Sequence, residues 1–122
     1  MQKISTDKAP AALGPYSQGI EANGFVFTAG QIPADPATGE IPKTVKEQAR
    51  RALSNLKAIL DASGDVTVVS TTVYLTDMAD FAEVNSVYAE YFPEPYPARS
   101  CVAVASLPKG VKIEVSAIAV KN

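Results

Sequence analysis

Two charged side chains, Arg99 and Glu114, lie in apolar segments near the end of the sequence. Arg99 follows a proline-containing turn and begins a segment with the composition of a strand, in which it shares a face with Cys101. If this segment forms a hairpin that pairs Cys101 with Glu114, Arg99 becomes the diagonal neighbour of Glu114, whereas a slip of one residue would separate them. The two side chains then form either a structural ion pair or part of a functional site, and the residues alone favour neither.

The residue types that are absent exclude several chemistries. The chain contains no histidine, so it cannot form a Ser-His-Asp triad or a Cys-His pair, and its single cysteine provides neither a disulfide nor a zinc cluster. Carboxylates are the metal ligands that remain, but they lack the spacing of a calcium loop, and segments 14–19 and 28–39 match no phosphate-binding pattern. We therefore expect a site without a metal or a nucleotide cofactor.

The composition is that of one globular domain spanning residues 1–122. Of the 122 residues, 47% are hydrophobic and 20% are charged, and the net charge is −2 with scattered basic side chains. Such a chain can bury a core, and scattered cations suit nucleic acid poorly. The N-terminal segment lacks an apolar signal core, and no apolar run approaches the roughly 20 residues that cross a bilayer. We expect a cytoplasmic protein that binds neither membrane nor nucleic acid.

The first half of the sequence predicts a hairpin, a loop and a helix. Strand-like segments flank an Asn-Gly dipeptide at 23–24, which suits the positive φ angles of a tight turn. The prolines and glycine of 31–43 predict an ordered surface loop. Thr44 and Glu47 then form a capping box, and apolar residues recur at helical spacing until Gly64.

The second half predicts three strands and a second helix. Segment 66–75 is rich in β-branched residues, and a helix is expected to begin after Asp77 and to end before Pro93. Strands at about 99–106 and 111–120 follow, and the LPKG segment between them suggests a hairpin connection. The predicted order is β-β-α-β-α-β-β, which is an α+β domain.

Two helices can cover only one face of this sheet. The last two predicted strands are apolar on both faces, because valines, isoleucines and alanines occupy alternate positions on each side. An apolar face left in water would lose about 25 cal/mol of stabilisation per Å² that could be buried. We therefore expect a homo-oligomer whose subunits bury the uncovered face.

The sequence resembles the reactive intermediate deaminase family, also called the Rid or YjgF-like family. The resemblance rests on GPYSQG, TAGQIP, TTVYLTDMADFAEVN and YPARSCVAVASLPKGVKIEVSAIAV, and it covers nearly the whole chain. It implies a homotrimer of chorismate-mutase-like α+β subunits, with sheets inside, helices outside and a site between neighbouring chains. It also implies hydrolysis of 2-iminobutanoate and 2-iminopropanoate to 2-keto acids and ammonia, as in the subgroup that retains the arginine.

The resemblance also implies roles for individual residues. Arg99 would bind the substrate carboxylate, and Glu114 would activate water. The residues that would line the ligand cleft are Tyr16, Gly30, Asn85 and Cys101. We interpret the cysteine as a lining residue because imine hydrolysis needs no covalent step. Ala29 stands where many members have serine, which removes a hydroxyl near the ligand.

The implied chemistry suits these groups. A planar guanidinium holds a carboxylate through two charge-assisted hydrogen bonds, and a positioned glutamate can deprotonate water and then protonate the departing ammonia. Neither histidine, metal nor cofactor is required. Two other functions stay open. One is a non-catalytic small-carboxylate-binding or chaperone-like module of the same fold, and the other, which a net charge of −2 disfavours, is a ribonuclease or translation inhibitor.

Overall fold

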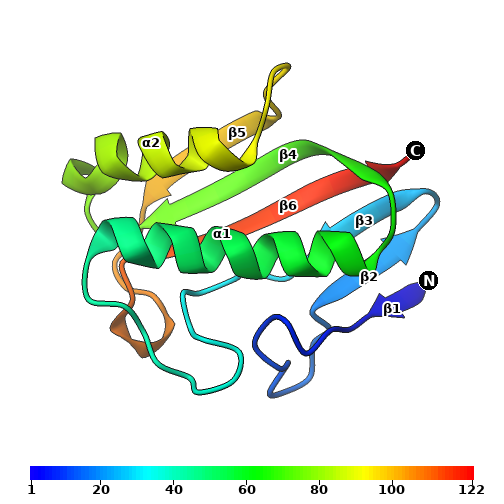
Figure 1. Ribbon diagram of the computed structural model, residues 1–122, viewed down its shortest axis with the longest axis horizontal. Coiled ribbons are helices and arrows are strands. Elements are labelled where there is room, and N and C mark those ends of the chain that lie inside the picture. Colours follow the sequence, from blue (N-terminus) through cyan, green and yellow to red (C-terminus); the bar gives the residue numbers. More distant parts are fainter.

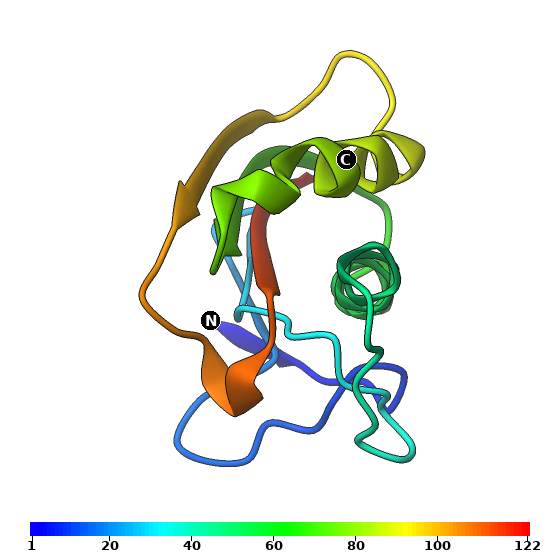
Figure 2. The same ribbon diagram turned by 90° about the vertical axis from the view of Figure 1, so that its left-hand side faces the viewer.

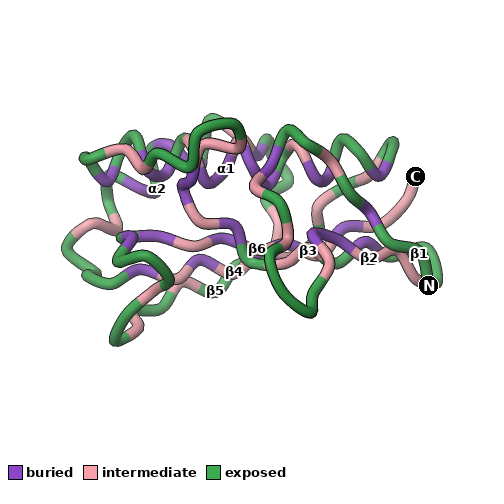
Figure 3. Tube along the Cα trace, turned by 90° about the horizontal axis from the view of Figure 1, so that it is seen from below, coloured by how far each residue is buried: buried purple, intermediate pink, exposed green.

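The computed structural model describes all residues from 1 to 122 and has two layers (Figures 1 and 3). One layer is a six-stranded sheet, and the other consists of two helices that cover one face of it. The strands are β1 (Gln2–Ile4), β2 (Gly19–Ala22), β3 (Phe25–Thr28), β4 (Val66–Leu75), β5 (Ala98–Ala103) and β6 (Ile113–Lys121). The helices are α1 (Val45–Ala62) and α2 (Phe81–Tyr91), with 3-10 turns η1 (Met78–Asp80) and η2 (Pro108–Gly110). The predicted α+β class is confirmed.

The predicted hairpin at the Asn-Gly dipeptide is confirmed. β2 and β3 pair antiparallel, and the two turn residues have positive φ angles of 52° at Asn23 and 79° at Gly24. Such angles match the twist of the flanking strands. The short strand β1, which the sequence did not predict, pairs with the outer edge of β2.

Helix α1 begins and ends where the sequence predicts. The Thr44 hydroxyl accepts a hydrogen bond from the Glu47 backbone N–H at 3.2 Å and donates to the Glu47 carboxylate at 2.9 Å. After the helix, Gly64 has a φ of 99°, a conformation that favours glycine. The buried face of α1 carries the apolar residues Ala49, Ala52, Leu53, Leu56, Ile59 and Leu60. The capping box and the apolar periodicity therefore fix this helix on the sheet.

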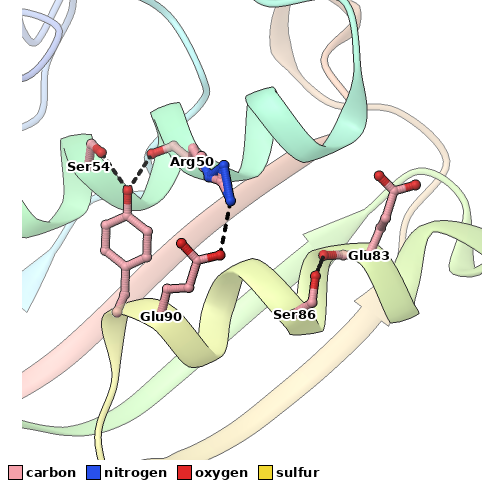
Figure 4. A network of polar contacts seen from close by, with 6 residues as sticks. Arg50, Ser54, Glu83, Ser86 and Glu90 are labelled. Atoms are coloured by element: carbon pink, nitrogen blue, oxygen red, sulfur yellow. Dashed lines mark hydrogen bonds and ion pairs between the residues drawn. The ribbon is translucent and has the colours of Figure 1, made fainter.

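Polar contacts hold α2 beside α1 (Figure 4). Arg50 donates to the Glu90 carboxylate at 3.0 Å, and the Tyr91 hydroxyl lies 2.8 Å from the Ser54 hydroxyl and 3.2 Å from the Arg50 carbonyl. Within α2, the Ser86 hydroxyl donates to the Glu83 carbonyl at 2.7 Å. Exposed ion pairs of this kind contribute little stability, so these contacts mainly fix the position of α2.

The expected hairpin between the last two strands is wrong. The strand order is β1-β2-β3-β6-β4-β5, so β4 separates β5 from β6. β5 runs parallel to β4, because the crossover through α2 returns the chain to the same end of the sheet. β6 pairs antiparallel with the other edge of β4 and with β3. The segment between them, which contains η2, leaves the sheet as a wide loop (orange in Figure 2).

A bulge in β4 keeps the core apolar along the whole strand. The register with β6 shifts between Val68 and Ser70. Before the shift Val68 packs against the core, and after it Val73 and Leu75 do so, which changes the inward positions from even to odd numbers. The extra residue therefore allows β4 to bury side chains at both of its ends.

The face of the sheet away from the helices is apolar and partly exposed. Phe25, Phe27 and Val102 have 42%, 43% and 44% of their surface exposed. Their pairing partners Val120, Ile118 and Tyr74 are half-buried on the same face. The uncovered apolar face is thus present, while the homotrimer stays a prediction. Neither helix has the length and hydropathy of a membrane span.

Candidate functional site

Arg99 lies on the helix-covered face of the edge strand β5. Its pairing partner on β4 is Thr71, and its side chain extends under α2. The guanidinium carbon is 4.7 Å from the centre of the Tyr88 ring and 5.4 Å from that of Phe81, and Nη1 donates to Asn85 Oδ1 at 2.7 Å. Arg99 takes part in none of the ion pairs of the chain. An exposed, unpaired and oriented guanidinium is a receptor for an anion.

An open cleft of about 410 Å³ surrounds this guanidinium. It is lined by Asn85, Tyr88, Ala89, Tyr96, Pro97 and Arg99. The structure thus brings together Arg99 and Asn85, two of the predicted site residues.

Cys101 follows on the same face of β5 as Arg99 and packs against the core, half-buried. Burial raises the pKa of its thiol, and the nearby positive charge of Arg99 offsets this only in part. The thiol therefore stays protonated at neutral pH and is a poor nucleophile. This agrees with a lining role.

Glu114 lies on β6 and points to the uncovered face. Its partner on β4 is Tyr74, which is also the partner of Val102 on β5. The carboxylate belongs to no ion pair and is half-buried, and this burial raises the pKa of Glu114. A carboxyl group with a raised pKa can both accept and return a proton near neutral pH.

Gly30 is packed directly against the Glu114 carboxylate. A Cβ atom at position 30 would lie 2.2 Å from Oε2 and 2.6 Å from Cδ, so any other residue would displace the glutamate. The next residue, Gln31, fixes this approach, because its backbone exchanges two hydrogen bonds with Val115, at 2.7 and 3.1 Å. Backbone pairing next to the contact therefore places Gly30 beside Glu114.

Tyr16 lies near Gly30 in a cleft of about 450 Å³ and is 55% exposed. The buried side chain of Gln18 holds the surrounding loop: it accepts from the Thr6 N–H at 2.7 Å and donates to the Pro10 carbonyl at 2.7 Å. The Gln18 carbonyl also accepts from Ala29 N–H at 2.8 Å, which ties the loop to Gly30. Tyr16, Gly30 and Glu114 therefore form a second group of predicted site residues.

The contact between Arg99 and Glu114 that one register of the expected hairpin would allow does not form within one chain. Paired residues of neighbouring strands point to the same face. Thr71 is paired with both Arg99 and Ala117, whereas Tyr74 is paired with Glu114, and positions 71 and 74 point to opposite faces. The two residues are thus separated by β4 and by the sheet itself, so they form neither an intrachain ion pair nor a complete site.

Two side chains that contact the Arg99 guanidinium, Phe81 and Tyr88, were not predicted as site residues. Phe81 and Tyr88 appear in the sequence as part of the apolar side of the second helix. Phe81, Asn85 and Tyr88 stand at i, i+4 and i+7, which places all three on one side of α2. This spacing was the sequence signal that could have identified the two aromatic residues as part of the site. At no place in the chain do three or more metal-ligating side chains of histidine, cysteine, aspartate or glutamate gather.

Residues 6–121 match the family model described as Endoribonuclease L-PSP. The 2-iminobutanoate/2-iminopropanoate deaminase of Escherichia coli (strain K12) is 52% identical, over 98% of this chain and 97% of the relative. A RutC family protein of Pyrococcus horikoshii is 57% identical over the same shares of the two chains. Among solved structures, Escherichia coli TdcF with bound serine matches with a TM-score of 0.95 and 50% identity, and all of both chains is covered.

Proposed function

Since the chain belongs to the endoribonuclease L-PSP family and is 52% identical to a 2-iminobutanoate/2-iminopropanoate deaminase, we propose that it hydrolyses reactive 2-imino acids and their enamines to 2-keto acids and ammonia. The resemblance to the reactive intermediate deaminases is thereby confirmed, while the arginine-retaining subgroup stays a prediction. The observation that carries the proposal is the unpaired guanidinium of Arg99, held by Asn85 beside an open cleft.

The proposed reaction uses only side chains of this chain and water. Arg99 binds the substrate carboxylate through two parallel hydrogen bonds and orients the imine carbon. Glu114 takes a proton from water as the water oxygen bonds to the imine carbon, and it then returns the proton to the nitrogen, which gives a carbinolamine. Glu114 next takes the hydroxyl proton of the carbinolamine and passes it to the amino nitrogen. The C–N bond breaks, ammonia leaves, and the hydroxyl oxygen becomes the carbonyl of the 2-keto acid. Burial of Glu114 favours this exchange, because it brings the pKa of the carboxyl group closer to neutrality.

Two copies of the chain are needed to complete this site. Arg99 and Glu114 lie on opposite faces of one sheet, so a small imino acid cannot reach both within one chain. β5 is an edge strand with an exposed arginine, and the uncovered face that carries Glu114 is apolar. Packing of the edge of one copy on the open face of the next joins the two groups and buries that face. The homotrimer implied by the family resemblance meets this requirement.

Mixing two inactive variants tests the shared site. Arg99→Ala and Glu114→Ala chains are each expected to be inactive, whereas trimers refolded from an equal mixture regain sites in which each partner supplies the intact residue. Random assembly predicts about one quarter of wild-type activity. Light scattering on the wild type at micromolar concentration checks the trimer, and 2-iminobutanoate generated in situ provides the substrate. A stable monomer, or a mixture as inactive as its components, would contradict the shared site.

A non-catalytic carboxylate-binding module of the same fold is distinguished by Glu114. In such a module the wild type does not accelerate imine hydrolysis, and Glu114→Gln leaves the affinity for the keto acid unchanged. In a deaminase Glu114→Gln abolishes turnover and leaves keto-acid binding nearly intact.

RNA hydrolysis is a second candidate because the matched family model is described as an endoribonuclease. The chain has no histidine for acid-base catalysis and a net charge of −2. We therefore expect no RNA binding even at low salt. Cleavage of RNA by the purified protein, or binding that weakens as salt rises, would support the second candidate.

A further inference from the structure

Arg99 is held by an aromatic surface rather than by an acidic side chain. Three side chains from one side of α2 contact it: Phe81 and Tyr88 lie along the guanidinium, and Asn85 accepts one of its N–H groups at 2.7 Å. We propose that Tyr88, anchored by Thr71, is a positioning residue that fixes the Arg99 guanidinium for carboxylate binding. This inference rests on the proposed function, because it concerns the carboxylate receptor of that site.

The Tyr88 ring is immobilised from two sides. Its hydroxyl lies 2.7 Å from the Thr71 hydroxyl, both residues are buried, and its ring centre is 4.6 Å from that of Phe92. Thr71 is also the pairing partner of Arg99 on the neighbouring strand. The strand that carries the hydroxyl anchor is thus hydrogen-bonded to the strand that carries the arginine. Movement of the ring relative to Arg99 would break the hydroxyl contact in a buried place.

An aromatic holder suits a carboxylate receptor better than an acidic one. A carboxylate partner would neutralise the guanidinium and occupy the in-plane N–H groups that the ligand requires. A ring stacked on the guanidinium plane attracts the cation while it leaves those in-plane groups free. Asn85 uses one N–H group, and the others remain for two parallel bonds to a ligand. The arginine is therefore ordered before binding, which lowers the entropy cost of binding.

This arrangement predicts that changes at Tyr88 weaken binding of the keto acid. Tyr88→Leu removes the stacked ring and is expected to weaken 2-ketobutanoate binding by about 3- to 30-fold. Tyr88→Phe keeps the ring but loses the anchor, so it falls between the wild type and Tyr88→Leu. In the deaminase assay KM rises by the same factor while kcat stays within about twofold, because the carboxylate contact is present in ground state and transition state alike.

Tyr91→Leu is the matched control. Tyr91 lies on the same helix and also makes a hydroxyl contact across an element boundary, but it contacts Ser54 and Arg50 rather than Arg99. The Tyr91→Leu substitution should lower the thermal unfolding temperature of the protein without changing its affinity for 2-ketobutanoate. Phe81→Leu, which removes the less buried ring, keeps the test available if Tyr88→Leu does not fold, and it is expected to weaken binding by about 2- to 5-fold.

Calorimetric titration with 2-ketobutanoate separates this inference from the proposed function. A wild type that binds the keto acid in a Tyr88-dependent way, but does not accelerate imine hydrolysis, would refute the deaminase and support the positioning role. A wild type that turns over while Tyr88→Leu binds equally well, or while Phe81→Leu does so where Tyr88→Leu does not fold, would overturn the positioning role alone. Failure of the wild type to bind the keto acid at all would also overturn it.

Discussion

Replacement of Arg99 by lysine keeps the charge and much of the length of the side chain but removes the planar fork. In the structure the guanidinium lies over the Tyr88 ring, Nη1 donates to Asn85, and Arg99 lines the open cleft. An ammonium group can satisfy Asn85 or attract a carboxylate, but it cannot offer two parallel bonds. The loss of one charge-assisted hydrogen bond costs about 1.5–3 kcal/mol. We therefore expect kcat/KM to fall by about 10- to 150-fold.

The fold should tolerate this change. Arg99 is exposed and belongs to no ion pair, and a lysine can still lie against the ring, so the free energy of unfolding should change by less than about 1 kcal/mol. Circular dichroism and light scattering of the variant check this point. Arg50→Lys is the control, because Arg50 is an exposed arginine on α1 whose partner is Glu90, and it should leave activity unchanged.

The assay must exceed the spontaneous hydrolysis of the imine. The substrate 2-iminobutanoate is generated in situ, and 2-ketobutanoate or ammonia is followed above the rate without enzyme. An Arg99→Lys protein that is folded, assembled and fully active would refute the reasoning, because it would show that the arginine does not hold the substrate.

Three further changes test other parts of the site. Glu114→Gln should abolish turnover and make the protein slightly more stable at neutral pH. Because the pKa of Glu114 is raised in the folded state, the free energy of unfolding of the wild type falls as pH rises through that pKa, whereas the glutamine variant has no such loss. For the same reason the acid limb of the wild-type activity profile should lie above the pKa of an ordinary glutamate, and a limb at or below it would contradict the burial of this group. Cys101→Ala should retain most activity, since its thiol is protonated at neutral pH; a loss as large as that of Arg99→Lys would indicate a covalent step. Gly30→Ala should reduce kcat strongly in a protein that still folds, because the added methyl would lie 2.2 Å from the Glu114 carboxylate; wild-type kcat would contradict the close packing.

Local signals predicted the elements that depend on neighbouring residues. The Asn-Gly turn and the capping box of α1 act over a few positions, so the β2–β3 hairpin and the start of α1 were readable from the sequence. β1 was missed because only three residues form it, two of them exposed, and it is defined by pairing with β2. The contact of Gly30 with Glu114 likewise depends on a bridge between Gln31 and Val115, far apart in sequence.

The partner of β5 could not be read from its own residues. Segments that follow one another favour a hairpin, and the LPKG segment is compatible with a turn. The crossover through α2 decides otherwise, because it places β5 parallel to β4 and leaves the opposite edge of β4 to β6. The burial of Ile113, Val115 and Ala117 beneath the helices favours this central position for β6.

The position of β4 separates the strands that carry Arg99 and Glu114. Even if β5 slipped by one residue and Arg99 turned to the face of Glu114, two strand spacings, about 9.6 Å, would lie between their strands. The side chain of Tyr74, the pairing partner of Glu114 on β4, would stand between them. In the observed register the two side chains also point to opposite faces of the sheet, so a 2-imino acid bound by Arg99 cannot present its imine carbon to a water on Glu114 of the same chain. The strand order therefore supports a site assembled from two chains, with the arginine of one and the glutamate of the other.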